Sequence, residues 1–333
     1  MTFTKVAALS FDRLNSVDTC YKCSGCEKVE KAKQVFILGA PRSGTTFLAS
    51  LLECTEYGAP FETQFIPKYY YKLQQYGDLN KIANFERLVS NILSERAIMQ
   101  WKLHIDVPEL FRSFNGDVTF SGLVDVLCSM AGGERGGYWG EKTPWYLREL
   151  PLITKLFPKA KYIYIVRDGR DVALSLLGKE WGPNNLYSCA EYWKDLNKLC
   201  PELEKLERNN QLISMSYEDL LDRTSENVAR VYEFLEQSRD NRVEGLISKA
   251  KKGNYNKWKA DLSSSQVKLF ENVCGDTLQR FGYETTYEQA GVPKVKKLLY
   301  LLHDRIVWGC FMIKTNIIDG FRIRFLGKEP FAD

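Results

Sequence analysis

The segment Gly39 to Thr46 (GAPRSGTT) has the residue types of a loop that holds an anion. Small residues leave backbone N–H groups accessible, and Arg42 adds a planar cation suited to a tetrahedral oxyanion. The spacing is that of a Walker A loop, but Thr45 stands where a nucleoside triphosphatase needs its lysine. The loop therefore predicts phosphate binding and disfavours a kinase or ATPase. The alternative is a helix capped by Ser43 beside an incidental glycine.

A second pair of polar residues could also hold a phosphate. In the segment AKYIYIVRDGRDVALSL, Arg167 follows a β-branched and aromatic run, and Ser175 comes eight positions later. An arginine and a hydroxyl at this spacing, across a turn and into a helix, can bind one phosphate group. The alternative is that Arg167 pairs with Asp168 or Asp171.

Both candidate loops lie where a strand passes into a helix. We expect strands over 34–40, 161–166 and 211–215, with helices over 43–53, 172–177 and 227–235. Strands that alternate with helices predict an α/β fold with a parallel β-sheet covered on both faces and ligands at the carboxyl ends of the strands. About 120 residues of mainly helical pattern between the first two strands would supply an acceptor pocket, and Tyr69, Tyr70, Tyr71 and Tyr76 either line it or simply pack.

The composition excludes several classes of protein. The 333 residues carry 46 basic and 42 acidic side chains and are 44% hydrophobic, which is typical of a globular protein without a nucleic-acid footprint. No apolar run is long enough for a membrane span. Nine cysteines without an Asn-x-Ser/Thr sequon predict reduced thiols and a cytoplasmic location. Cys20, Cys23 and Cys26 lack an obvious fourth ligand, so we expect no metal there.

With APRSGTTF at 40–47 and VRDGRDVALSLL at 166–177, the chain resembles the sulfotransferases that use 3′-phosphoadenosine 5′-phosphosulfate (PAPS). The resemblance implies a P-loop NTPase-like sulfotransferase fold with helical insertions. It also implies that the 3′-phosphate binds Arg167 and Ser175. The residues that would bind the 5′-phosphosulfate are Arg42, Ser43, Gly44, Thr45, Thr46 and Phe47.

Two shorter segments extend the resemblance. Tyr217 lies in a segment similar to the family's YEDL, whose tyrosine is near the adenine, and Lys251, Lys252 and Gly253 resemble the basic loop that closes over the 3′-phosphate. The resemblance covers roughly 34–283. We therefore expect a sulfotransferase domain over 34–283 between an N-terminal extension, 1–33, and a C-terminal helical extension, 284–333, whose apolar stretch predicts a docking helix.

The resemblance also points to the reacting groups. Lys142 in GEKTP is similar to the lysine of the Golgi-type carbohydrate and tyrosylprotein enzymes, and Glu62 in FETQFIP maps onto the proposed base. With Arg42, these are the predicted catalytic residues; His104 is the alternative base. The structural alternatives are a glutamate at a helix N-terminus for Glu62 and an ion pair with Glu141 for Lys142.

The predicted function is transfer of the sulfuryl group of PAPS to a hydroxyl of a small molecule or a glycan-like alcohol, with no metal required. A tyrosylprotein sulfotransferase acting on peptides is the alternative within this chemistry. An ATP-dependent nucleotide or small-molecule kinase is the alternative from another class. The acceptor is the expected partner, no nucleic acid or membrane span is expected, and a homodimer is possible.

Overall fold

The computed structural model describes residues 32–132, 137–179, 181–198 and 201–314. These residues form two compact units. We call residues 32–166 and 201–254 the sheet unit and residues 167–198 and 255–314 the helical unit, and we describe each by itself. The Cys20, Cys23 and Cys26 cluster lies outside the described residues.

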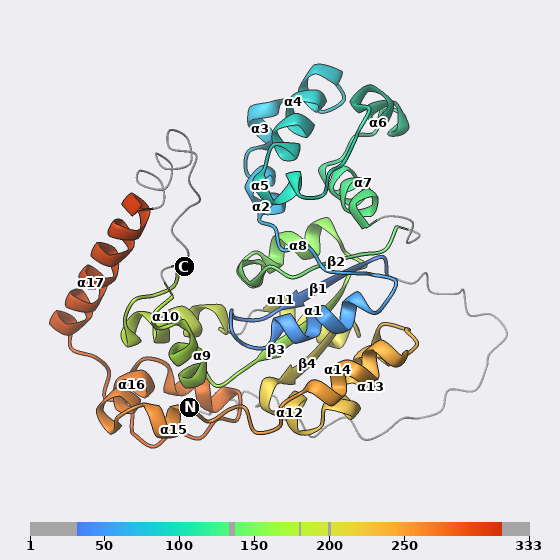
Figure 1. Ribbon diagram of the computed structural model, residues 1–333. Coiled ribbons are helices and arrows are strands. Elements are labelled where there is room, and N and C mark those ends of the chain that lie inside the picture. Colours follow the sequence, from blue (N-terminus) through green and yellow to red (C-terminus); the bar gives the residue numbers. More distant parts are fainter. Residues whose placement is uncertain (1–31, 133–136, 180, 199–200, 315–333) are drawn as a thin grey trace, which may run out of the picture. The chain divides into compact units, whose positions relative to one another are not determined.

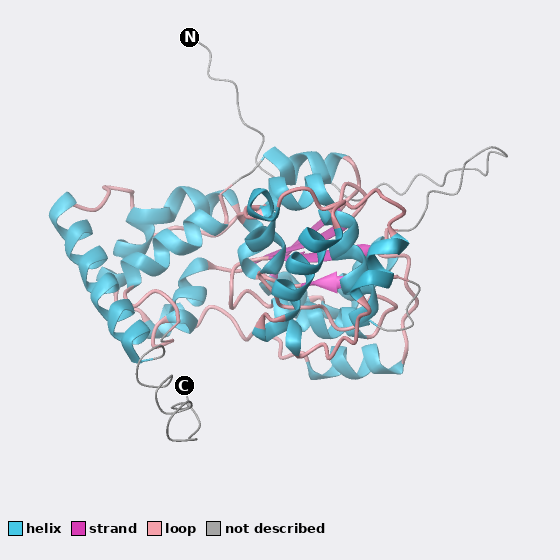
Figure 2. Ribbon diagram, turned by 90° about the horizontal axis from the view of Figure 1, so that it is seen from above, coloured by secondary structure: helices cyan, strands magenta, loops and turns pink. Residues whose placement is uncertain are grey.

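The sheet unit is built on four parallel strands in the order β2-β1-β3-β4. Figure 1 labels these strands, and Figure 2 shows the strands in magenta. Their bounds are β1 Gln34–Leu38, β2 Trp139–Glu141, β3 Lys161–Val166 and β4 Leu212–Ser216. This confirms the predicted parallel α/β fold. Three strands were expected from their apolar runs, whereas β2 is too short, at three residues, to show a pattern.

Alternating side chains of the strands form two different layers. One face, through Ile37, Ile165 and Met215, packs on aliphatic residues of α1, α12, α13 and α14. The other is aromatic: the Phe36 ring lies 5.6 Å from that of Tyr162 and 5.7 Å from that of Phe157, which follows α8. Period-two alternation with both faces buried is what a covered parallel sheet requires.

The helices of the sheet unit fall into three groups along the chain. The first follows β1, the second forms the insertion between α1 and β2, and the third surrounds β3 and β4. Their bounds are α1 Thr45–Glu53; α2 Phe65–Tyr70, α3 Leu73–Tyr76, α4 Ile82–Leu93, α5 Arg96–Met99, α6 Val107–Ser113 and α7 Phe120–Gly132; and the 3₁₀ turn Pro144–Leu147, α8 Leu150–Leu156, α11 Pro201–Arg208, α12 Tyr217–Asp222, α13 Thr224–Phe234 and α14 Asn241–Lys249.

The tyrosines of the insertion have separate roles. Tyr69 and Tyr76 are buried, and the Tyr69 hydroxyl donates to the carbonyl of Asn91 at 2.7 Å. Packing therefore accounts for these two. Tyr71 is exposed, and its hydroxyl donates to Glu149 at 2.7 Å.

The helical unit contains α9 Gly169–Leu176, α10 Leu186–Leu196, α15 Trp258–Asp261, α16 Ser264–Arg280 and α17 Lys294–Ile313. α10 packs on α9 and α16 through the fully buried Trp193, whose ring lies 6.3 Å from that of Phe270. A Cβ at Gly169 would lie 2.5 Å from the Trp193 ring, so only glycine fits at the start of α9. The predicted C-terminal helix is present as α17.

Candidate functional site

The loop between β1 and α1 has the backbone of an anion cradle. A Cβ at Gly39 would lie 2.6 Å from the carbonyl oxygen of Ile165, so only glycine fits at this position after β1. Arg42 and Gly44 both have positive φ, 69° and 95°. A residue with a side chain is strained in this conformation, so the backbone at Arg42 carries a conformational free-energy cost. Such a cost is common where backbone groups are arranged for a ligand.

The first turn of α1 has backbone donors but no side-chain cap. Its N-cap is Gly44, and no side chain caps it. Ser43 is fully buried, and its hydroxyl has no hydrogen-bond partner among the described residues. The alternative of a helix capped by Ser43 is therefore wrong. A buried hydroxyl beside uncapped N–H groups leaves donors for an anion, and these residues fit the 5′-phosphosulfate of PAPS.

Tyr217, at the end of β4, lies against this loop. A Cβ at Gly44 would come within 2.5 Å of the Tyr217 ring. The hydroxyl of Tyr217 accepts from Asn254 Nδ2 at 3.4 Å. Asn254 directly follows Gly253, which has φ 69°, and the exposed Lys251 and Lys252. The sheet unit thus brings the anion loop, the predicted adenine-side tyrosine and the lysine segment together.

Glu62 and Lys142 form an ion pair, although they are 80 residues apart in the chain. Phe61 extends the sheet by one residue beside β2. Its N–H donates to Gly140 O at 2.9 Å, and Lys142 N–H donates to Phe61 O at 2.7 Å. The Lys142 side chain is 12% exposed and that of Glu62 is 60% exposed. The structure therefore brings together the predicted base and lysine. Lys142 pairs with Glu62 rather than Glu141, and Glu62 precedes α2.

Glu141 joins the end of β2 to the segment that contains Glu62 and Thr63, a role that was not predicted from the sequence. Glu141 is 1% exposed, and its carboxyl accepts from Thr63 N–H at 2.9 Å and from the Thr63 hydroxyl at 3.3 Å. Thr143 Oγ1 contacts both Glu141 and the carbonyl oxygen of Thr63. Thr63 and Thr143 are the chain neighbours of Glu62 and Lys142, so this cluster fixes the backbone on which the ion pair stands. In the sequence, the one sign of this role is that Glu141 directly precedes Lys142.

The carboxyl group of Glu141 lies among buried hydrogen-bond donors. The Thr143 hydroxyl donates to Glu141 Oε1, and the same hydroxyl also lies against the carbonyl oxygen of Thr63. These donors favour the charged form of the carboxyl group, whereas its burial disfavours that form. Burial has the larger effect and raises the pKa of Glu141 to about 8, with the Glu62 carboxylate as a smaller contribution in the same direction. Glu141 therefore keeps its proton to a higher pH than an exposed glutamate does.

His104, the alternative base, lies exposed in the loop between α5 and α6. Within the described part of the chain, no hydrogen bond or ion pair joins it to Lys142. Its loop is held near Glu62 through Trp101, whose ring lies 4.4 Å from that of Phe61. The geometry favours Glu62 over His104 as the group that works with Lys142.

The helical unit contains the second set of residues predicted to bind a phosphate. Arg167 is 9% exposed and its guanidinium lies 3.3 Å from the Asp171 carboxylate. Asp171 also accepts from the backbone N–H of Asn256 at 2.7 Å and of Trp258 at 3.0 Å. The alternative pairing of Arg167 with Asp171 is thus present. A carboxylate that also accepts from two backbone N–H groups fixes the position of the Arg167 guanidinium. Ser175 lies on α9, about one turn beyond Asp171.

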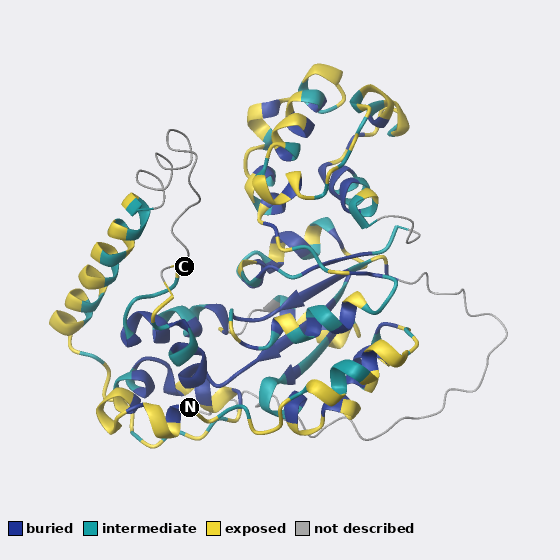
Figure 3. Ribbon diagram, in the orientation of Figure 1, coloured by how far each residue is buried: buried dark blue, intermediate teal, exposed yellow. Residues whose placement is uncertain are grey.

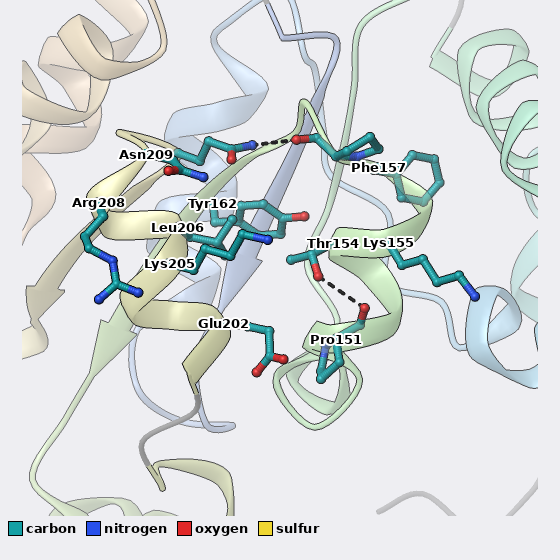
Figure 4. Close-up of a pocket in the computed structure, with 12 residues that line it drawn as sticks. Pro151, Thr154, Lys155, Phe157, Tyr162, Glu202, Lys205, Leu206, Arg208 and Asn209 are labelled. Atoms are coloured by element: carbon teal, nitrogen blue, oxygen red, sulfur yellow. Dashed lines mark hydrogen bonds between the residues drawn. The ribbon is translucent and has the colours of Figure 1, made fainter.

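The sheet unit has a cavity at the amino ends of β3 and β4 (Figure 4). It measures about 520 Å³ and is open between α8 and α11, with Lys155, Lys205 and Arg208 among its lining side chains. Tyr162 is fully buried beneath it. Because the predicted chemistry lies at the carboxyl ends of the strands, we do not assign the cofactor to this cavity.

Among the described residues, no three His, Cys, Asp or Glu side chains are grouped as metal ligands. The described cysteines, which are Cys54, Cys128, Cys189, Cys274 and Cys310, carry free thiols. In the part of the chain that the structure describes, no helix is long and apolar enough to cross a bilayer.

A family model described as "Sulfotransferase family" matches residues 34–241, which is more than half of the sequence. The chain belongs to the sulfotransferase family. This membership agrees with the parallel sheet and with the glycine-rich loop after β1. The match begins at the first residue of β1 and ends at the first residue of α14, so it includes the anion loop, Glu62, Lys142 and Arg167.

The curated relatives of this sulfotransferase are similar over part of their length. Protein-tyrosine sulfotransferase A of Caenorhabditis elegans is 26% identical over 230 residues, which are 65% of this chain and 53% of the relative. Human protein-tyrosine sulfotransferase 1 is 26% identical over 167 residues, 48% of this chain and 39% of the relative. The chain therefore spans about half the length, or less, of these relatives.

Solved structures are also similar. The sulfotransferase domain from the curacin biosynthetic pathway has a TM-score of 0.45 at 18% identity, covering 77% of this chain and 99% of that one. Mouse sulfotransferase SULT7A1, crystallised with PAP, has a TM-score of 0.42 at 13% identity, covering 74% and 85%.

Proposed function

We propose that the protein is a PAPS-dependent O-sulfotransferase that modifies a hydroxyl of a small molecule or a glycan-like alcohol. The observation that carries the proposal is the uncapped start of α1 with the buried, unpartnered hydroxyl of Ser43. Membership of the sulfotransferase family supports a phosphosulfate anhydride as the bound anion. When bound, PAPS supplies a sulfuryl group attached to a phosphate leaving group.

The residues of the sheet unit would then have separate roles. Glu62 accepts the proton of the acceptor hydroxyl, and its 60% exposure leaves it accessible to an incoming acceptor. Lys142 and Arg42 neutralise charge on the leaving 5′-phosphate, while Thr45, Thr46 and the loop N–H groups donate hydrogen bonds to it. In the resting protein Lys142 compensates Glu62, so the two are set up together. We assign the 3′-phosphate to Arg167 and Ser175, and the adenine side to Tyr217.

Thermal unfolding with adenosine 3′,5′-bisphosphate, ADP and ATP, each with and without Mg²⁺, tests the cofactor. A ligand at about 100 times its Kd stabilises a protein by roughly 2.7 kcal/mol. We expect stabilisation by the bisphosphate without Mg²⁺ and its loss in Arg42→Ala, whereas Arg112→Ala, an exposed arginine on α6, keeps it. Stabilisation only by ATP with Mg²⁺ would instead support the kinase alternative.

A protein tyrosine is the second candidate acceptor, because the curated relatives are protein-tyrosine sulfotransferases. Transfer of ³⁵S from labelled PAPS to a tyrosine-containing acidic peptide, run beside a panel of small alcohols and glycans, distinguishes the two. Labelling of the peptide alone would replace the small-molecule proposal. The free thiols support a cytoplasmic location as part of the proposal, and the homodimer stays a prediction for sedimentation analysis.

A further inference from the structure

α17 is attached to the helical unit by one side. The Tyr300 ring stacks on that of Tyr187 with centroids 5.4 Å apart and planes at 12°. The Asn184 N–H donates to the Asp304 carboxylate at 2.6 Å, and the Asn185 side chain donates to Tyr300 O at 2.9 Å. These contacts fix which side of α17 faces α10 and which side faces away from it.

The side of α17 that faces away from α10 carries an apolar stripe. Six aliphatic residues at spacings of 3, 4, 7, 11 and 18 from the first lie within about 100° of the helix circumference, since each residue turns the helix by about 100°. They are between 51% and 71% exposed. Figure 3 shows exposed residues along the length of this helix, none of whose residues is buried. The stripe consists of Val295, Leu298, Leu299, Leu302, Ile306 and Ile313.

The stripe is about 27 Å long at 1.5 Å per residue. Isolated exposed leucines are ordinary on a protein surface, but a contiguous apolar row of this length marks an interaction site. Tyr300 and Asp304, which contact α10, lie on the other side of the helical wheel, so the docking contacts do not cover the stripe.

Positive charge borders the stripe on both sides. Lys296 flanks one edge, Lys294 and Arg305 flank the other, and all three are exposed. The single acidic residue of α17 is Asp304, and it is held by Asn184 on the side that packs against α10. An apolar stripe between cationic rows is complementary to a surface that combines hydrocarbon with negative charge. In a face-to-face pair of such helices, the cationic rows would lie near one another, which disfavours a second copy as the occupant.

We propose that α17 is an interfacial helix that docks the protein on an anionic lipid surface. The aliphatic row enters the boundary between headgroups and acyl chains, and the basic rows extend to the headgroup phosphates. The helix lies in the plane of the membrane and does not cross it. The proposal concerns a surface of the helical unit and does not depend on the sulfotransferase activity.

Co-sedimentation of the full chain with vesicles tests this docking. One set contains phosphatidylcholine alone, and the other contains phosphatidylcholine mixed with phosphatidylserine. We expect binding to the mixed vesicles, weaker binding to the neutral ones, and release as salt shortens the Debye length. No binding to either set overturns the proposal.

Two sets of variants test whether vesicle binding depends on α17. Leu298→Ser with Leu302→Ser lowers the partition coefficient at least tenfold, because two exposed leucines no longer leave water. Changing Lys294, Lys296 and Arg305 to Gln removes the preference for phosphatidylserine. Ile82→Ser with Met99→Ser, exposed apolar residues of the sheet unit, leaves binding unchanged. Equal loss in this control pair overturns the assignment.

Sedimentation velocity and ligand binding complete the design. A concentration-dependent dimer that Leu298→Ser with Leu302→Ser dissociates, without vesicle binding by the wild type, identifies a second copy as the occupant and overturns the lipid proposal. Stabilisation by adenosine 3′,5′-bisphosphate is measured for each variant, so that loss of the fold or of cofactor binding is distinguished from loss of docking.

Discussion

Two groups of opposite charges in this protein differ in burial. In the helical unit, Arg170 is 2% exposed and donates to Asp168 at 2.8 Å and to Glu271 at 2.8 Å, while its guanidinium carbon lies 3.7 Å from the Trp258 ring centroid. In the sheet unit, Lys142 is mostly buried but its partner Glu62 is mainly in solvent.

The difference in burial separates a cluster closed to solvent from a pair that solvent can reach, which agrees with the proposed roles of Glu62 and Lys142. Glu271 also accepts from the backbone N–H groups of Thr286 and Tyr287, so the buried network has every acceptor occupied inside the unit. A substrate could not displace these contacts. The contact between Lys142 and Glu62 has an open side, because Glu62 is accessible. A charge pair that must exchange partners during a reaction needs such access.

The largest expected effect is on the buried network. Arg170→Met leaves Asp168 and Glu271 without their cation, and breaking a buried pair in this way costs about 3–5 kcal/mol of unfolding free energy. Urea denaturation measures it. Arg280→Met, an exposed arginine of α16, serves as the control with an expected change below about 0.5 kcal/mol. A cost below about 1 kcal/mol for Arg170→Met would contradict the structural role of this network.

Glu62→Gln should have the opposite profile. We expect sulfuryl transfer to fall on the order of 10³-fold because the base is removed, while the urea midpoint changes little because Glu62 is exposed. Steady-state assays with labelled PAPS measure the rate, and Glu226→Gln on α13 is the matched exposed control. If Glu62→Gln stays active and His104→Ala is inactive, the base is His104.

Lys142→Met should lower kcat on the order of 10²-fold, because one cation at the leaving phosphate is lost. Binding of adenosine 3′,5′-bisphosphate should persist, since the α1 loop and Arg167 are unchanged. Isothermal titration beside the kinetic assay separates the two quantities, with Lys81→Met as the exposed control. Equal losses of binding and rate would make Lys142 a binding residue only.

The smallest effect is expected at Glu141 and appears as a pH dependence. Its folded-state pKa is raised to about 8 from 4.5. Between these values the native state holds a proton that the unfolded state has released, so stability is full below about pH 4.5 and falls as pH rises toward 8. Three other titratable groups interact electrostatically with Glu141: Glu62, Cys128 and Tyr146.

Glu141→Gln keeps the shape without the titration. From pH 5 to 8, the wild type should lose at least about 1 kcal/mol more than this variant in urea unfolding, and the variant should keep most of its activity. Glu141→Leu, which removes the hydrogen bonds, should lose activity. An inactive Glu141→Gln would show instead that the charge of Glu141 is required.

Local sequence patterns were sufficient to predict much of the fold. β1, β3 and β4 are apolar runs followed by turn residues, and the loop from Gly39 to Thr46 is contiguous. Glu62 and Lys142 were predicted as residues of one site only through the family resemblance. Their ion pair was not predicted, because it depends on Phe61 lying beside β2, a strand of three residues. The burial of Glu141 and the missing cap on α1 were not predictable, since both depend on packing between segments distant in the chain.

The contact between Gly44 and Tyr217 restricts which substitutions the protein can accept at these two positions. A methyl group at residue 44 would overlap the tyrosine ring at 2.5 Å, and the positive φ at this residue remains whatever occupies position 217. A library randomised at residue 44 alone should therefore return almost only glycine. Varying both positions together relieves the overlap but not the backbone strain. The residue types allowed at positions 44 and 217 therefore depend on each other, although the two positions are 173 residues apart along the chain.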